Sequence, residues 1–208
     1  MNAIEAVQLT DWRRRVGELY AKVRELGAGE AAWALWREGK QRLYREHPQS
    51  PVPPPQRRSY VFACFDHDRA FRVGAELVAC PPRHIDGDGE VPGLTTVGTL
   101  HFTLLGATCE LDAYWLDGYA GGLFVPVADA ASGSETYGGG RYVLDTAKGA
   151  DLGNDGTHVV LDFNFAYAPS CAHDPRWRCP LAPPRNRLAV ALRAGERSPS
   201  DRAPGGGG

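Results

Sequence analysis

The stretch TTVGTLHFTLLGATCELDAYWL, Thr95 to Leu116, predicts an antiparallel β-hairpin and with it the fold class of the chain. Two runs rich in Val, Leu, Thr and aromatic residues lie on either side of Gly106. Runs of this composition favour strands, and a glycine between them supplies the positive φ that a tight hairpin turn requires. We therefore expect residues 95–105 and 107–117 to pair as neighbouring strands.

Similar short segments occupy the rest of the chain after Tyr60, and after Arg72 no convincing long helix separates them. Regular strands without intervening helices are typical of antiparallel folds. We therefore predict a mainly β protein with an N-terminal α-helical arm, whose body is an antiparallel β-barrel or sandwich of about eight strands. The further strands are expected in YVFACF, FRVGAELVAC, GLFVPVAD, GRYVLD, HVVLDFNF and RLAVALRAG.

The residues before this body carry a helical pattern. Apolar residues recur at helical spacing in 11–26, where Thr10 or Asp11 can cap the helix, and again from about Glu30 to Glu46. The expected organisation has four parts: a helical hairpin arm (1–47), an extended proline-rich linker (48–57), an antiparallel β domain (58–197) and a disordered tail (198–208).

Composition limits the function classes. The net charge of −2 lacks the strongly basic balance of a nucleic-acid-binding domain. No apolar run is long enough to span a bilayer, and no secretory leader is visible. We therefore expect a cytoplasmic protein without nucleic-acid or membrane partners, whose five cysteines are mostly reduced. Cofactor and oligomeric state stay open.

The glycine-rich segment DAASGSETYGGGRY, 129–142, is a candidate binding site. Three successive glycines allow a backbone to approach a ligand closely, and Arg141 offers a rigid fork of donors to a carboxylate or phosphate. Tyr137 and Tyr142 could line such a pocket. The alternative is a hairpin turn in which Arg141 pairs with an internal acid such as Glu135 or Asp162.

The segment Asp162-Phe163-Asn164-Phe165 is a second candidate. If it continues a strand, Asp162 and Asn164 share one face and the two phenylalanines share the other. A polar pair inside a barrel must be hydrogen-bonded or bound to a ligand. A solvated outer face is the alternative.

Cys171 and Cys179, with His173 between them, form the third candidate. Their spacing does not match a C-x-x-C redox or zinc motif. Four interpretations remain: structural thiols flanking a loop, a disulfide, a metal site with His173 or Cys64, and a catalytic nucleophile. The prolines that follow Cys179 favour a rigid structural pair, so no metal site is predicted.

These segments together resemble a known family. The chain carries GSETYGGGRY at 133–142, DFNFAYAPSCA at 162–172 and CPLAPPRNRL at 179–188. This combination resembles the bacterial domain-of-unknown-function family 1684 over roughly residues 45–197. The chain differs from the usual pattern of that family at Ala130, Ala168, His173 and Arg185.

The resemblance names no reaction, because the family has no assigned function. It implies that the shared residues matter together, namely Arg141, Tyr142, Asp162, Asn164, Tyr167, Cys171, Cys179 and Asn186.

Three functional hypotheses follow. The first is a protein that binds a small anionic or polar ligand in a β-barrel-like pocket. Its expected ligand-binding residues are Glu135, Tyr137, Arg141, Tyr142, Asp162, Asn164, Tyr167 and Asn186. The second is a hydrolase or thiol-dependent enzyme that uses Asp162 or Glu135 as acid and base, or Cys171 as nucleophile. The third is a non-catalytic interaction protein whose polar residues satisfy one another.

Overall fold

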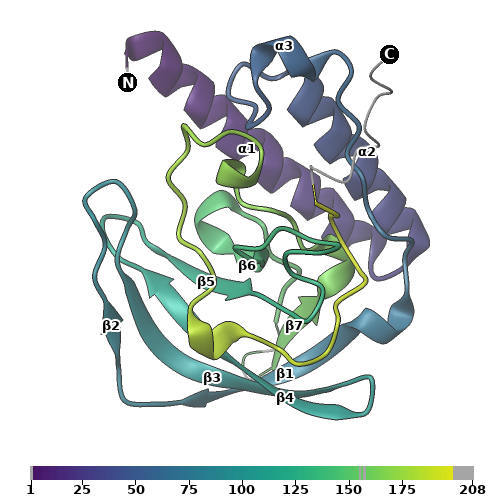
Figure 1. The fold of residues 1–208 in the computed structure, drawn as a ribbon, viewed down its shortest axis with the longest axis vertical. Coiled ribbons are helices and arrows are strands. Elements are labelled where there is room, and N and C mark those ends of the chain that lie inside the picture. The colour runs from purple at the N-terminus through teal and green to yellow at the C-terminus, as the bar shows by residue number, and fades with distance from the viewer. Residues whose placement is uncertain (1, 155, 157, 199–208) are drawn as a thin grey trace.

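The computed structural model describes residues 2–154, 156 and 158–198 (Figure 1). Two helices, α1 (Ala3–Leu26) and α2 (Glu30–Glu46), lie side by side across one side of a curled antiparallel sheet. The prediction of a mainly β protein with an N-terminal helical region is confirmed. The expected tail lies outside the described residues, apart from Ser198.

Helix α1 begins eight residues earlier than its apolar pattern predicts, because a capping box fixes its first turn. The Asn2 side chain accepts a hydrogen bond from the Glu5 amide at 2.9 Å, and the Glu5 carboxylate accepts one from the Asn2 amide at 2.7 Å. The predicted cap, Thr10 or Asp11, therefore lies inside the helix. Helix α2 has the predicted bounds and ends before Pro48.

The proline-rich segment after α2 is not an extended spacer. Residues Pro54–Arg57 form the short helix α3, and both Ser50 and Val52 are buried. The Arg57 guanidinium donates to the Val52 carbonyl at 2.9 Å, which folds the segment back on itself. The segment is therefore folded and partly buried instead of extended.

Seven strands form one antiparallel sheet in the described part of the chain, in the order β6-β5-β4-β3-β1-β7 with β2 paired to β3. The sheet curls into a half-barrel and stays open between β6 and β7. The predicted barrel or sandwich of about eight strands is therefore corrected to an open half-barrel of seven described strands. The strands are β1 (Arg72–Ala79), β2 (His84–Ile85), β3 (Leu94–Leu104), β4 (Ala107–Leu116), β5 (Gly122–Val127), β6 (Arg141–Asp145) and β7 (His158–Asp162).

The hairpin between β3 and β4 is the one that the sequence predicts. Leu104 pairs with Ala107, which leaves Leu105 and Gly106 as a two-residue turn. Both have positive φ, 49° and 81°, as a type I′ turn requires. Gly106 takes this conformation without the strain that a side chain adds.

Two predicted strands, 60–65 and 187–195, are not strands in the structure. Each forms only an isolated bridge, Cys64 with Glu196 and Arg187 with Ala128. In the second segment, the carbonyl groups of Leu192, Ala194 and Glu196 accept hydrogen bonds from the Arg141 side chain instead of from a neighbouring strand. We call residues 187–196 the C-terminal segment.

Two buried clusters hold these layers together. The first joins the helices to the sheet through aromatic side chains such as Trp36, Phe62 and Phe165. The second joins the long strands to the C-terminal segment through Leu100, Leu192 and their neighbours. Strands β5 and β6 contribute to both clusters, so the helical hairpin shares its core with the sheet.

Candidate functional site

Arg141 holds the C-terminal segment in place. It begins β6 and its side chain is fully buried. One terminal nitrogen donates to the carbonyls of Ala194 and Glu196, and the other donates to Leu192 O at 2.8 Å and to the Asp129 carboxylate at 3.3 Å. Among the described residues, only Nε of this guanidinium has no partner. Arg141 thus pairs with an internal acid, as the alternative interpretation of the sequence holds, but the acid is Asp129 and not Glu135 or Asp162.

Asp129 extends the same attachment. Its Oδ1 accepts hydrogen bonds from the amides of Ala131 at 2.7 Å and Leu192 at 3.1 Å, while Oδ2 faces Arg141. Burial lowers the pKa of Arg141, and the negative charge of Asp129 opposes that effect. One ion pair thus connects β6, the 129–131 turn and the C-terminal segment.

The glycine run serves this packing. Gly140 has φ of 87°, and a Cβ there would lie 2.7 Å from the Val127 carbonyl oxygen and 2.8 Å from Ala182 Cβ. Only glycine fits so close to the chain's own backbone. The close approach that the sequence suggests is therefore made to β5 and to the segment that follows Cys179.

Asp162 and Asn164 do not lie on one face of a strand. Strand β7 ends at Asp162, and residues 163–165 turn into a short 3₁₀ helix in which all three are buried. The Asn164 side chain accepts from the Asp68 amide at 2.9 Å and donates to the Asp68 carbonyl at 2.8 Å. Asp162 pairs with Arg72 at 3.3 Å. The two residues thus anchor the 68–72 turn, away from the partners of Arg141.

The other predicted ligand-binding residues also have partners within the chain. The buried Asn186 amide donates to the carbonyls of Asp112 at 2.9 Å and Pro126 at 2.7 Å. Three further contacts join Glu135 to Arg193 at 2.9 Å, the Tyr142 hydroxyl to Pro180 O at 2.7 Å, and the Tyr167 hydroxyl to Asp145 at 2.9 Å. A ligand-binding role for this set stays a prediction, and its observed contacts are internal.

Cys171 and Cys179 are both free, partly buried thiols and form no disulfide. The hydroxyl of Tyr137 is 3.8 Å from the Cys171 sulfur. A hydrogen bond between the two thiol groups raises the pKa of Cys171 and lowers that of Cys179 to about 6. Within the described residues, no group of three or more His, Cys, Asp or Glu side chains could hold a metal ion.

A buried cation under α2 was not predicted from the sequence. Lys40 is 3% exposed, and its ammonium lies over the rings of Tyr167 at 3.9 Å and Tyr44 at 4.7 Å. Burial lowers the pKa of Lys40 to about 8. The signal was available, because Lys40 shares a helical face with Trp33 and Trp36, both buried.

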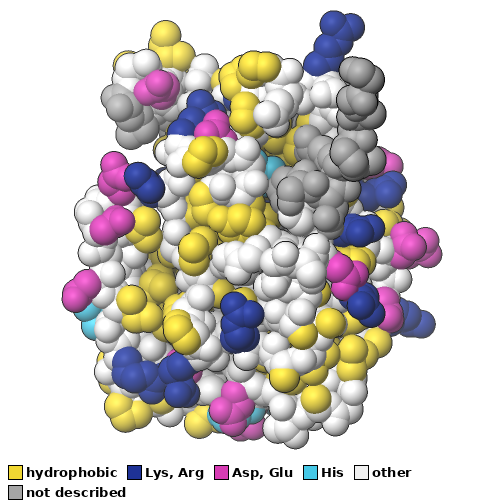
Figure 2. Space-filling model, in the orientation of Figure 1, with side chains coloured by type: hydrophobic (Ala, Val, Ile, Leu, Met, Phe, Trp, Pro, Cys, Tyr) yellow, Lys and Arg dark blue, Asp and Glu magenta, His cyan; other side chains and the backbone are white. Residues whose placement is uncertain are grey.

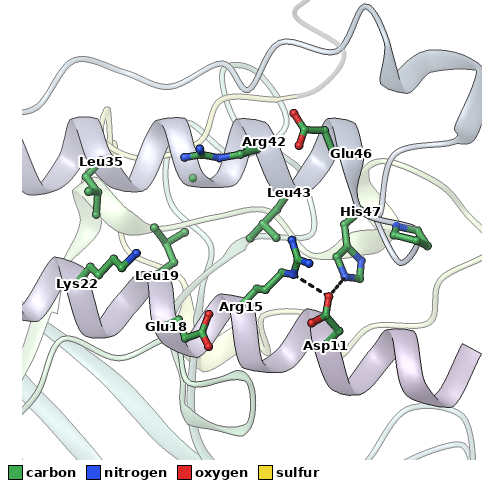
Figure 3. Close-up of a pocket in the computed structure, with 12 residues that line it drawn as sticks. Asp11, Arg15, Glu18, Leu19, Lys22, Leu35, Arg42, Leu43, Glu46 and His47 are labelled. Carbon is green, nitrogen blue, oxygen red and sulfur yellow. Dashed lines mark hydrogen bonds and ion pairs between the residues drawn. The ribbon is translucent and has the colours of Figure 1, made fainter.

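A groove of about 700 Å³ runs between α1 and α2 (Figure 3). The helices approach closely where Gly39 faces Leu19, since a Cβ on Gly39 would lie 2.5 Å from a Leu19 methyl group. The residues that line the groove are Asp11, Arg15, Glu18, Leu19, Lys22, Leu35, Gly39, Arg42, Leu43, Glu46, His47 and Pro48. None of the eight predicted ligand-binding residues is among them.

The charges of the groove are unevenly paired. Asp11 accepts from Arg15 at 2.7 Å and lies 3.1 Å from the ring of His47. Burial alone would raise the pKa of Asp11, but hydrogen bonds from His47 and Arg14 lower it below its ordinary value. Lys22 and Arg42, by contrast, make no ion pair within the described part of the chain, and both reach toward the region of Leu19 (Figure 3).

A second hollow, of about 50 Å³, lies between the end of α1 and the sheet. It is lined by Val23, Arg24, Gly27, Arg72, Leu152 and Phe165, and has room for little more than a water molecule.

On the face shown in Figure 2, Lys and Arg side chains are interspersed with Asp and Glu. None of the described helices is long and apolar enough to cross a membrane.

These features define a class of protein: an antiparallel β half-barrel capped by a helical hairpin, with an internally bonded C-terminal segment and a surface groove on the cap. A family model described as "Protein of unknown function (DUF1684)" matches residues 61–197. The chain therefore belongs to the DUF1684 family, and the resemblance seen in its sequence is confirmed.

The chain is also similar to a solved structure. The solution NMR structure of an uncharacterized protein of Haloarcula marismortui is 35% identical, with a TM-score of 0.60. The match covers 79% of this chain and 91% of that one. No curated protein matches the chain. These similarities establish the family of the chain, and they identify neither a ligand nor a reaction.

Proposed function

We propose that this protein is a non-catalytic binding protein that takes a small organic anion in the groove between α1 and α2. The observation that carries the proposal is the pair of exposed cations, Lys22 and Arg42, which have no ion-pair partner among the described residues and flank an apolar floor. A volume of about 700 Å³ lies within the range of small-molecule sites.

The chemistry of the groove suggests the form of the ligand. Leu19 and Leu43 offer an apolar surface, while Lys22 and Arg42 offer donors to a carboxylate, sulfonate or phosphate. The other end of the groove carries Asp11 and Glu46, which would repel an anion. An anion with an apolar body, bound with its charged group toward Lys22, satisfies these features.

The proposed ligand site therefore lies on the helical cap, and not inside the curled sheet where the sequence predicted a pocket. Packed side chains of the second cluster fill the space inside the curled sheet. The polar residues expected to line a pocket there, such as Arg141 and Asn186, donate hydrogen bonds to backbone carbonyls of the chain. The hydrolase alternative finds less support, because Asp162 and Glu135 are each occupied by an arginine, Arg72 and Arg193.

Titration of the full chain with 8-anilinonaphthalene-1-sulfonate, an anion with an apolar body, tests the proposal by its fluorescence. We expect the double variant Lys22→Gln/Arg42→Gln to bind about tenfold more weakly, the loss of about 1.4 kcal/mol of charge-assisted contacts. Decanoate should displace the dye from the wild-type protein.

The matched control is Arg13→Gln, which removes an exposed cation of α1 outside the groove. It should bind the dye as the wild type does. Equal affinity in the double variant and the wild type would refute a site at this groove, as would an equal loss in the control.

A further inference from the structure

Two copies of one short motif, Pro-Pro-Arg, occur in the chain at residues 81–83 and 183–185. A proline ring fixes its own φ and restricts the residue before it, so each arginine follows a stiff stretch of backbone. The first motif lies between β1 and β2, where the Arg83 carbonyl accepts a hydrogen bond from the Thr96 amide at 2.8 Å. The second motif runs into the 3₁₀ turn Pro184–Asn186, which lies against β4. Both arginines therefore extend from fixed segments.

The two motifs meet at a buried acid on β4. The Asp112 side chain is 2% exposed, and its Oδ2 accepts from Arg83 at 2.8 Å and from Arg185 at 2.9 Å. Burial alone would raise the pKa of Asp112, but hydrogen bonds from the two arginines lower it below its ordinary value. The carboxylate thus stays charged and holds two guanidinium groups side by side, with one positive charge in excess.

Most donors of this arginine pair are unused. A guanidinium carries five N–H donors, and Arg83 and Arg185 each make one side-chain hydrogen bond within the described part of the chain, to Asp112. Their side chains are 45% and 62% exposed, so a ligand can reach the pair from solvent. The pair therefore combines free donors, excess positive charge and a fixed geometry.

We propose that Arg83 and Arg185 form a binding site for a phosphate group that carries two negative charges. A phosphate on the solvent side contacts both guanidinium groups, while the buried Asp112 lies behind them. The attraction at contact distance exceeds the repulsion from the more distant carboxylate, and a second negative charge on the ligand doubles that difference. The three terminal oxygens of a phosphate also suit two planar arginine forks, which bind such groups through paired hydrogen bonds.

This site is separate from the groove between α1 and α2. Neither Arg83 nor Arg185 lines the groove. The chemistry also differs, because the groove offers an apolar floor beside its cations, whereas the arginine pair offers charged donors at the surface. The inference therefore stands whether or not the groove binds an organic anion.

Titration of the isotope-labelled full chain with inorganic phosphate and with phenyl phosphate at pH 7.5, followed by NMR of the arginine Nε–H groups, tests the proposal. At this pH both ligands are mainly dianions. We expect saturable shifts of the Arg83 and Arg185 signals. Dimethyl phosphate, which carries one negative charge, should bind at least about fivefold more weakly.

Arg193 is the internal control in these spectra. Its Nε donates to Glu135 at 2.9 Å and its side chain is 65% exposed, which closely matches the contact and exposure of Arg185. Among the described residues, however, no second arginine pairs with Glu135. The Arg193 signal should therefore stay where it is.

Variants test the pair directly. Arg83→Gln and Arg185→Gln each leave Asp112 with one arginine, and each should weaken phosphate binding about tenfold. Arg193→Gln should bind phosphate as the wild type does. Binding of inorganic phosphate alone would assign the site to the free ion, and binding of phenyl phosphate as well would assign it to a phosphate carried on an organic molecule. No saturable shift of either arginine in the wild type, or an equal loss in Arg193→Gln, would overturn the proposal.

Discussion

Arg141 and Arg42 carry the same guanidinium group in opposite surroundings. Arg141 is fully buried and bonds three carbonyls and one carboxylate. Arg42 is exposed on α2 and makes no ion pair within the described residues, like its neighbour across the groove, Lys22. The first is committed to the fold, while the second stays exposed to solvent.

The difference shows why a charged motif in a sequence does not by itself mark a binding site. A buried charge must find partners because its desolvation is costly, so Arg141 is surrounded by groups of its own chain. An exposed cation loses little by remaining unpaired in water. A site for an external anion is therefore expected where cations are exposed beside apolar surface, and the groove has that arrangement.

The largest expected effect on stability is that of replacing the buried Arg141. Replacing Arg141 with Met leaves the Asp129 carboxylate buried without its cation and three carbonyls without a donor. We expect a loss of about 3–5 kcal/mol in the free energy of unfolding, measured by urea denaturation.

Arg193→Met is the matched control, because Arg193 lies on the same C-terminal segment but pairs with Glu135 at the surface. It should cost less than about 1 kcal/mol. Similar urea midpoints for Arg141→Met and the wild type would show that the C-terminal segment does not depend on this contact.

An intermediate effect is expected at Lys40, on the inner face of the helix whose outer face carries Arg42. Its pKa is about 8 in the folded state against 10.5 for the free side chain. The unfolded state therefore binds the extra proton between these pH values, and stability rises with pH across that window. At about 1.4 kcal/mol per unit, the gain is about 3 kcal/mol.

Lys40→Met should remove this gain. The variant should also be more stable than the wild type at pH 7 by about 1–2 kcal/mol, since the relief of desolvation exceeds the lost contact with the Tyr167 ring. Urea unfolding of both proteins at pH 7 and pH 9.5 measures the difference, which in the wild type should amount to about 2 kcal/mol of the full gain over this range. Parallel pH dependences in the two proteins would contradict a buried, proton-linked lysine.

The smallest effect on stability is expected for the exposed cations of the groove. Lys22→Gln/Arg42→Gln should leave the free energy of unfolding within about 0.5 kcal/mol of the wild type, because neither side chain has an ion-pair partner to lose in the described structure. Thermal unfolding followed by circular dichroism checks this. A large destabilisation would show that these cations belong to the fold, as Arg141 does.

The sequence predicted those elements correctly whose signals lie within a few neighbouring residues. The hairpin turn at Gly106 and the end of α2 before Pro48 depend on neighbouring residues only, and both are as expected, although the turn also includes Leu105. The strand predicted at 187–195 is absent. Its Val and Leu content suits a strand, but its carbonyl groups accept hydrogen bonds from Arg141, which lies far away in the chain.

The candidate sites show the same limit. The sequence singled out Arg141, Asp162 and Asn186 as residues with a special role, and the structure gives each a set of internal partners. The groove went unnoticed because its residues come from two helices whose exposed faces read as ordinary solvated surface. No spacing within either helix reveals that Gly39 lets Leu19 approach.

By itself, the sequence determined the antiparallel β body, the two helices and the family, because periodicity, turn glycines and linked motifs are carried by residues close together in the chain. Only the tertiary structure decided that the sheet stays open and that Arg141 meets Asp129. Those outcomes depend on which distant segments are brought together as apolar side chains are buried, and short-range patterns do not encode that choice.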